Sequence, residues 1–252
     1  MIPNPWDVGS ARYLAHLGFK ALASTSAGLA FAQGLPDNRV GREAVLAHLA
    51  ELVEATDLPV NADFENGFAH DPPGVAESVR LCAQTGVAGL SIEDSTGDAA
   101  APLYEHAQAV ARIRAARDAL DRDASDVLLV GRAEGFLVGR PDLDDVIRRL
   151  RAYADAGASC LYAPGLRKRE QIAAVVEAVA PTPFNLLVSS PLGLSVAEIA
   201  ALGVRRISVG GALARAAWGG FMRAATEIAD RGTFDALADA APHAALQKLF
   251  ST

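Results

Sequence analysis

The chain contains few cysteines, few aromatic residues and no long apolar run. Only Cys82 and Cys160 occur among its 252 residues, and neither has a C-x-x-C partner, so we expect two buried, reduced thiols and no disulfide framework. No apolar run reaches the roughly 18–20 residues of a membrane span. The opening M-I-P-N-P-W-D also lacks the basic and apolar regions of a signal peptide. We therefore expect a soluble, cytoplasmic protein without a membrane partner.

Basic residues are also scarce. The chain has 23 Lys and Arg against 30 Asp and Glu, which gives a net charge of −7. Without a basic patch, nucleic acid is not expected as a partner, although a few arginines can still form a local site for a small anion. A dinucleotide-binding fold has no support either, because no G-x-G-x-x-G follows a predicted strand.

Short apolar runs alternate with longer amphipathic segments along the chain, in which hydrophobic residues make up 51%. The apolar runs predict seven strands, at residues 19–23, 58–62, 87–92, 127–130, 160–163, 184–188 and 206–209. The amphipathic segments predict helices at residues 9–17, 42–56, 74–85, 103–120, 143–156, 168–180, 195–202 and 212–229.

Strands that alternate with helices indicate parallel strands joined by helical crossovers. The sequence therefore predicts an α/β protein, a (β/α)₈ TIM-type barrel that spans residues 1–252 as a single domain. Residues 1–3 would supply the eighth strand as an unusually short stub. Eight units in this length average about 31 residues each, which suits a barrel. A doubly wound open sheet is the alternative.

Two carboxylates lie close together in V-N-A-D-F-E-N-G-F, residues 60–68. Asp63 and Glu65 are two positions apart, so on a strand they share one face. Like charges side by side repel unless a cation lies between them, and Mg²⁺ prefers carboxylate oxygens. Taken alone, the pair is also consistent with a polar strand end that runs into a turn.

Other polar residues follow the predicted strands in the same way: Thr25, Ser26, Glu93, Asp94, Arg132, Glu134, Ser189 and Ser190. In a barrel of this kind, the carboxyl ends of the strands meet at one rim, where the chemistry takes place. Acidic and basic groups recur about one barrel unit apart, and this recurrence favours a metal site over polar strand ends without a function.

Six motifs occur in order along the chain: residues 4–11 (N-P-W-D-V-G-S-A), 18–27 (G-F-K-A-L-A-S-T-S-A), 33–37 (Q-G-L-P-D), 62–67 (A-D-F-E-N-G), 91–94 (S-I-E-D) and 131–136 (G-R-A-E-G-F). Together they resemble the isocitrate lyase/phosphoenolpyruvate mutase superfamily. The resemblance covers nearly the whole chain, up to V-R-R-I-S-V-G-G-A at residues 204–212. It implies a modified (β/α)₈ barrel whose last helix is exchanged with a neighbouring subunit. On this basis residues 212–252 form the exchanged C-terminal segment of a homodimer or homotetramer.

The resemblance also implies a site that binds Mg²⁺, with Mn²⁺ as the alternative ion, and a small 2-oxo acid substrate. Asp63 corresponds to the principal metal ligand, and Glu65 and Glu93 to ligands that act directly or through water. Thr25 and Ser26 correspond to the pair that binds the substrate carboxylate. The expected catalytic residues are Arg132, which also binds substrate, Asp37 and Glu93.

One departure from the superfamily bears on the reaction. The lyases carry a K-x-C-G-H loop after the glutamate of the S-I-E-D strand, and the mutases carry a lysine and an asparagine there. This chain has S-T-G-D-A-A-A-P at residues 95–102. It resembles a short, phosphonomutase-like branch without the catalytic cysteine loop, which argues against isocitrate lyase activity.

Three functions remain open. The first is an enzyme, a Mg²⁺-dependent lyase that cleaves a C–C bond of a small 2-oxo or 2-hydroxy acid, by retro-aldol cleavage or decarboxylation, through a metal-stabilised enolate. The second is a P–C enzyme, a phosphoenolpyruvate phosphonomutase or phosphonopyruvate hydrolase. The third is a non-catalytic binder of 2-oxo acids.

Overall fold

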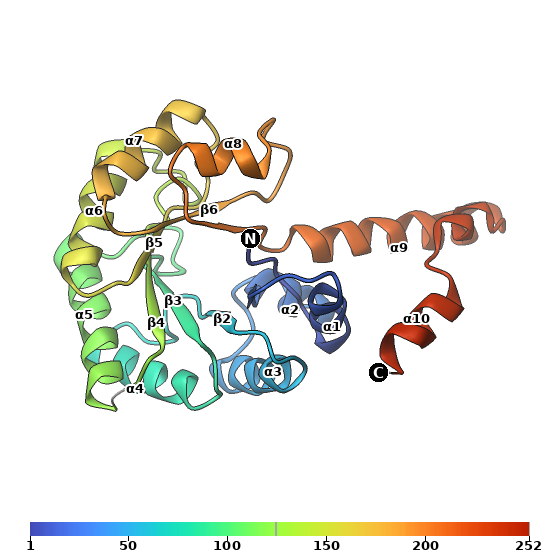
Figure 1. Cartoon of the computed structure of the whole chain (residues 1–252), viewed down its shortest axis with the longest axis horizontal. Helices are drawn as coiled ribbons and strands as arrows, with labels where there is room; N and C mark the ends of the chain where they lie inside the picture. Colours follow the sequence, from blue (N-terminus) through green and yellow to red (C-terminus); the bar gives the residue numbers. More distant parts are fainter. Residues whose placement is uncertain (124, 252) are drawn as a thin grey trace.

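The structure is a computed structural model that describes residues 1–123 and 125–251. Seven parallel strands lie side by side in chain order and curve into a nearly closed barrel (Figure 1). They are β1 (Leu22–Ala23), β2 (Val60–Asp63), β3 (Gly89–Glu93), β4 (Leu128–Arg132), β5 (Cys160–Tyr162), β6 (Phe184–Leu187) and β7 (Arg206–Ser208). Each overlaps a predicted strand, and the order confirms the TIM-type barrel over the doubly wound sheet, whose strand order would reverse at a switch point.

Helices cover the outside of the sheet (Figure 1). In chain order, the helices of the structure are α1 (Val8–His16), α2 (Ser26–Ala32), α3 (Arg42–Glu54), α4 (Pro72–Ala83), α5 (His106–Arg122), α6 (Leu143–Asp155), α7 (Arg169–Val179), α8 (Val196–Ala201), and then three that leave the barrel, α9 (Ala212–Arg231), the 3₁₀ helix η1 (Asp235–Asp239) and α10 (His243–Phe250). The eight predicted helices are confirmed, whereas α2, η1 and α10 were not predicted. Within residues 1–123 and 125–251, no helix has the length and apolar character needed to cross a membrane.

Helix α6 illustrates why these segments fold as they do. The Asp142 side chain accepts a hydrogen bond from the backbone N–H of Asp145 and so caps the first turn. Val146, Leu150 and Tyr153 recur at helical spacing and are all buried against the barrel. The predicted boundaries of this helix are therefore correct to one residue.

The N-terminal stub closes the barrel. The N–H of Ile2 donates to the carbonyl of Ile207 on β7 at 2.8 Å, and the N–H of Ala23 on β1 donates to the carbonyl of Pro3 at 3.0 Å. The Asn4 side chain extends this seam, because its Oδ1 accepts from the N–H of Val209 at 2.8 Å. The stub thus occupies the predicted position of the eighth strand, with too few bonds to form a regular one.

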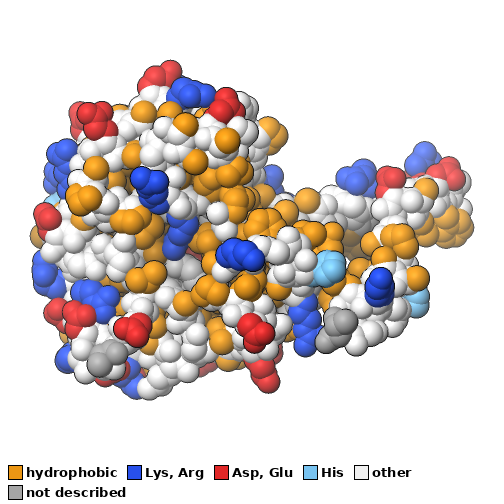
Figure 2. Space-filling view, in the orientation of Figure 1, with side chains coloured by type: hydrophobic (Ala, Val, Ile, Leu, Met, Phe, Trp, Pro, Cys, Tyr) orange, Lys and Arg blue, Asp and Glu red, His pale blue; other side chains and the backbone are white. Residues whose placement is uncertain are grey.

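The last three helices form an arm, residues 212–251, that leaves the barrel (Figure 1). Helix α9 exposes large apolar side chains, among them Trp218 and Phe221, and Figure 2 shows hydrophobic surface along the arm. The chain then turns back at Glu227, whose carboxylate accepts hydrogen bonds from the backbone N–H groups of Asp235 and Ala236. This buried acid thus ties η1 to α9, and α10, which follows, packs against α1.

Candidate active site

Arg132 is the centre of the polar cluster at the carboxyl ends of β2, β3 and β4. Its Nη1 lies 3.0 Å from Oδ1 of Asp63 and 3.2 Å from Oε2 of Glu93. Its Nε donates to Oε1 of Glu134, two residues further on. Because the register pairs Glu93 directly with Arg132, these side chains meet on one face of the sheet. The structure therefore brings together three of the residues predicted for the site: Asp63, Glu93 and Arg132.

Carboxyl groups outnumber positively charged groups in this cluster. Burial, followed by the charge of Asp63, raises the pKa of Glu65 to about 8. Burial also raises the pKa of Glu93 well above its usual range, against the opposing effect of Arg132. The pKa of Glu134 is raised for the same reason. One guanidinium thus faces several carboxyl groups, and an additional cation would relieve their mutual repulsion.

The carboxylate groups of this cluster suit a Mg²⁺ ion that keeps some of its water ligands better than a metal whose ligands are all protein side chains. Within the described part of the chain, no three His, Cys, Asp or Glu side chains converge closely enough to hold a metal by themselves. Mg²⁺ commonly retains several waters and is held by one or two carboxylates together with substrate oxygens. Asp63, with Glu65 and Glu93 beside it, offers such oxygen ligands, so the residues present fit this ion.

The segment after β1 fixes the position of Asp63. The backbone N–H of Ser26 donates to Oδ2 of Asp63 at 2.9 Å, and the N–H of Asp63 donates to Oγ of Ser24 at 2.9 Å. Thr25 caps α2, since its Oγ1 accepts from the N–H of Gly28. Thr25 and Ser26 therefore lie beside the acidic cluster, at the N-terminus of a helix that the sequence analysis missed.

Asp37 approaches the cluster from the segment between α2 and α3. The residue as a whole is exposed, but the pKa of its carboxyl group is raised, first by loss of solvent and then by the charge of Asp63. Its side chain also hydrogen-bonds that of Ser26. Asp37 is thus near the predicted metal ligands, at the outer edge of the site.

Glu65 lies in a tight turn that follows β2. Its φ of +48° and that of Phe68, +55°, fall in the left-handed region, as does the +75° of Gly67. Non-glycine residues seldom adopt this conformation, so the surroundings must hold it in place. The carbonyl of Glu65 accepts from the N–H of Glu93 at 3.0 Å, which ties the turn to β3.

A second buried network, which the sequence analysis did not find, supports the first. Oδ1 of Asp94 accepts from the backbone N–H of Glu134 at 2.8 Å, and Oδ2 accepts from Tyr153 Oη at 2.5 Å and from Arg149 Nη1 at 3.2 Å. Asp94 therefore positions the backbone of the residue that contacts Arg132. The i, i+4 spacing of Arg149 and Tyr153 on one helix was the available signal.

Tyr162, at the end of β5, is a further residue that the sequence analysis missed. Cζ of Arg132 lies 5.0 Å from the centre of its ring, within the range of a cation–π contact. Its hydroxyl hydrogen-bonds Ser208, and burial raises the pKa of the phenol above its usual value. Tyr162 thus forms the floor beneath Arg132, where it excludes water from one face of the guanidinium.

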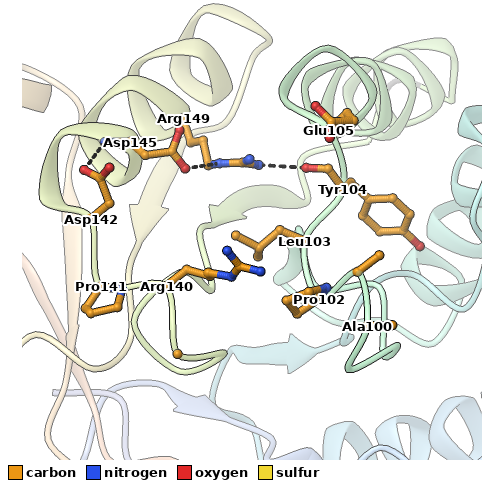
Figure 3. Close-up of a pocket in the computed structure, with 12 residues that line it drawn as sticks. Ala100, Pro102, Leu103, Tyr104, Glu105, Arg140, Pro141, Asp142, Asp145 and Arg149 are labelled. Atoms are coloured by element: carbon orange, nitrogen blue, oxygen red, sulfur yellow. Dashed lines mark hydrogen bonds and ion pairs between the residues drawn. The ribbon is translucent and has the colours of Figure 1, made fainter.

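The loop at residues 95–102 is a compact turn. Ser95 and Leu103 form an antiparallel bridge, and the N–H of Thr96 donates to the carbonyl of Pro102 at 3.0 Å. Next to the loop, a cavity of about 670 Å³ lies between residues 100–105 and 139–142 (Figure 3). Arg149 lines it and donates to Asp145 and to the carbonyl of Tyr104 (Figure 3). None of the residues predicted for the site lines this cavity.

The model of the phosphoenolpyruvate phosphomutase family matches residues 1–229. The chain belongs to this family. It is thereby a member of the isocitrate lyase/phosphoenolpyruvate mutase superfamily, as the six motifs predicted. The names of family members and relatives include mutases, lyases and decarboxylases.

Several proteins are similar in sequence or structure to this member of the phosphomutase family. A Mycobacterium tuberculosis protein, Rv1998c, is 34% identical over 83% of this chain and 77% of its own length. An oxaloacetate decarboxylase from Paraburkholderia xenovorans is 32% identical, with 69% of this chain and 59% of the relative covered. A crystal structure of a Burkholderia cenocepacia protein, provisionally assigned as a lyase/mutase, is 53% identical with a TM-score of 0.96, and the match covers 100% of this chain and 91% of that one.

Proposed function

We propose that this protein is a Mg²⁺-dependent lyase that cleaves a C–C bond of a small 2-oxo or 2-hydroxy acid. The observation that carries the proposal is the fixed position of Arg132 among Asp63, Glu93 and Glu134 at the barrel rim. When the bond between the α and β carbons of a carbonyl compound breaks, the electron pair left on the α carbon is delocalised onto the carbonyl oxygen as an enolate, and a fixed cation stabilises that oxygen. The loop at residues 95–102 contains no cysteine, lysine or histidine, the residue types that the lyases and mutases of the superfamily carry there.

Each residue has a role in this scheme. Asp63 would hold the ion, with Glu65 and Glu93 acting directly or through water, and the ion would supply a Lewis acid for the 2-oxo group. Thr25 and Ser26 would bind the substrate carboxylate beside the N-terminus of α2. Arg132 would bind the enolate oxygen, and its planar guanidinium, flanked by Tyr162, orients that interaction. Asp37 would act at the outer edge, where substrate enters.

The names of relatives support a dicarboxylic substrate. Besides the oxaloacetate decarboxylases, solved structures of an oxaloacetate acetylhydrolase bound to oxalate and of 2,3-dimethylmalate lyase resemble this chain, at 29% and 27% identity with TM-scores of 0.87 and 0.86. Each covers 98% of this chain. With an oxaloacetate-like substrate, the C3–C4 bond breaks, CO₂ leaves, and C3 of the resulting enolate takes up a proton.

A P–C reaction is the second candidate. The family model describes a phosphoenolpyruvate phosphomutase, and a Burkholderia cenocepacia structure provisionally assigned as a phosphonomutase is 35% identical over 92% of this chain, with a TM-score of 0.80. The missing lysine and asparagine in the loop at residues 95–102 argue against it. A non-catalytic binder would keep the same cluster but turn over neither kind of substrate.

The deciding experiment measures pyruvate release from oxaloacetate in Mg²⁺ buffer, after a thermal-shift screen of 2-oxo acids with and without the ion. Asp63→Asn protein in the same buffer gives the background rate. Release above that background supports the lyase. Turnover of phosphonopyruvate alone would establish the P–C reaction instead. A Mg²⁺-dependent shift without any turnover would establish the binder, and no shift at all would refute the metal site.

We further propose that residues 212–252 are exchanged between subunits of a homodimer or homotetramer. The apolar face of α9, which includes Phe221 at 62% exposure, is the support for this assembly. Burial of such a face in a neighbouring subunit would remove a large apolar surface from water. Light scattering of wild type and of a Phe221→Glu variant tests it, and a monomeric wild type would refute it.

A further inference from the structure

Arg112 is an arginine in an unusual environment. It lies on α5, is 1% exposed and is one of the largest fully buried side chains. Among residues 1–123 and 125–251, no Asp or Glu forms an ion pair with it. A buried charge without a carboxylate partner is unfavourable unless other groups satisfy it. Its burial therefore calls for a specific set of acceptors.

Those acceptors are all backbone carbonyls of one short segment. Nη1 of Arg112 donates to the carbonyls of Ala69 and His70, the latter at 2.8 Å, and Nη2 donates to the carbonyl of Asn66. Its Cζ also lies 4.0 Å from the centre of the Tyr104 ring. The planar guanidinium can reach three carbonyls at once because its donors have a fixed fork geometry.

The segment that Arg112 binds is the turn that carries Glu65. Asn66 directly follows Glu65, and the left-handed residues Glu65, Gly67 and Phe68 lie within or beside the bound stretch. The Asn66 side chain adds one link, from its Nδ2 to the carbonyl of Ser95 at 3.2 Å. Gln108, one turn before Arg112 on α5, donates more weakly to the carbonyl of His70 at 3.3 Å.

We propose that Arg112 is a positioning residue that clamps residues 66–70 and thereby fixes the carboxylate of Glu65 in the acidic cluster. It touches neither Asp63 nor Arg132, so its effect on the site passes through the turn. The role in catalysis rests on the proposed function, whereas the clamp itself does not. Lysine cannot replace it, since a single ammonium group lacks the fork that spans three carbonyls.

The clamp is tested first without substrate, by hydrogen exchange of wild type, Arg112→Lys and Arg114→Lys proteins. Arg114 is an exposed arginine on the same helix that donates to the carbonyl of Asp155, so its variant is the matched control. We expect exchange of residues 64–70 to rise by about tenfold or more only in Arg112→Lys. Gln108→Ala, which removes an exposed donor, should give a smaller rise and serves if Arg112→Lys does not fold.

The second measurement asks whether the effect passes through Glu65. Turnover should fall by about 10- to 100-fold in Arg112→Lys, as for removal of an outer supporting partner, with KM nearly unchanged. In a Glu65→Gln background the same substitution should change kcat by no more than about twofold, because the group it positions is already altered. The rise in Tm on addition of Mg²⁺ can be measured without turnover, and it should be smaller in Arg112→Lys than in wild type.

The outcomes separate the two proposals. Unchanged exchange at residues 64–70 in the variants would overturn the clamp, whatever the substrate. Raised exchange with an unchanged Mg²⁺ shift and unchanged kcat would overturn the positioning role. A wild type that turns over nothing would instead refute the proposed function, and the exchange and Mg²⁺ measurements would still decide on Arg112.

Discussion

The two halves of the barrel rim differ in charge. The ends of β2, β3 and β4 carry Asp63, Glu93 and Arg132, whereas residues 163–166, 188–191 and 209–212, which follow β5, β6 and β7, contain no charged side chain. We call this second part the neutral half, although the guanidinium of Arg167 reaches its edge and donates to Ser190 and to the carbonyl of Pro191. The neutral half contributes the Tyr162 ring and the Ser208 hydroxyl. On the proposed function, the charged half would bind the reacting end of a substrate, and the neutral half would line the space around the remainder.

The largest loss is expected for Asp63→Asn, in the charged half. The amide keeps the shape of the side chain but removes the charge that would hold a cation, so kcat should fall by about 10²–10³-fold or more. Steady-state turnover and the Mg²⁺-dependent thermal shift measure this. Asp57→Asn, an exposed acid that precedes the same strand, is the control and should behave as wild type.

The second largest loss is expected for Arg132→Lys, whose kcat/KM should fall by about 10²-fold. Lysine keeps the positive charge but loses the two-sided contact with Asp63 and Glu134. Kinetics of Arg132→Lys and of Arg140→Lys, an exposed arginine beyond the same strand, measure it. If both variants were equally active, Arg132 would have no place in the site.

Asp94→Ala should affect the stability of the charged half. Removal of the carboxylate leaves the buried Arg149 and Tyr153 without their common acceptor, which should cost about 3–5 kcal/mol of unfolding free energy. Urea denaturation measures it, with Asp118→Ala, an exposed acid on α5, as the control. A change as small as that of the control would show that the network does not stabilise the rim.

The charged half should also respond to pH without Mg²⁺. The pKa of Glu65 is about 8 in the folded chain, above its ordinary value near 4.5, so the folded state binds more protons between these values. The contribution of Glu65 to the free energy of unfolding is therefore fully present below about pH 4.5 and is lost as the pH rises towards 8. Denaturation between pH 5 and 8 should show this slope flattened in Glu65→Gln but kept in Glu51→Gln, an exposed control.

The smallest effect is expected for Ser208→Ala, in the neutral half. The variant loses hydrogen bonds with Asn185 Nδ2, at 3.0 Å, and with Tyr162, which should lower the unfolding free energy by about 1–2 kcal/mol. Turnover should stay within about twofold of wild type. A loss of kcat comparable to that of Arg132→Lys would abolish the distinction between the two halves.

The barrel could be predicted from the sequence because most strands lie in short, largely buried apolar runs and most helices carry a regular apolar face. Helix α2 was missed because Ser26–Ala32 is short and has no polar face that marks a helical period. Helix η1 and helix α10 were missed because they are short, five and eight residues, and neither has a capping side chain at its start. The last predicted helix therefore stopped at residue 229, although the C-terminal segment was predicted to extend to residue 252.

The site was predictable only in part. The proximity of Asp63, Glu93 and Arg132 could be predicted because the ends of parallel strands meet at one edge of a sheet. The burial of Arg112 could not be predicted, since an arginine on an amphipathic helix resembles a solvent-facing residue and its carbonyl acceptors leave no mark in the sequence. The metal ligands, the substrate contacts of Thr25 and Ser26 and the role of Asp37 remain predictions.

The seam at Asn4 has a consequence for how the chain folds. Its side chain bonds the backbone of Val209, a residue 205 positions away, and Ile2 bonds Ile207 in the same place. Closing so long a loop carries a large entropic penalty before any contact compensates for it, and such distant pairings slow folding. The barrel is therefore expected to close last at this seam, after β1 to β7 have assembled in order, so variants of Asn4 should accelerate unfolding more than they slow folding.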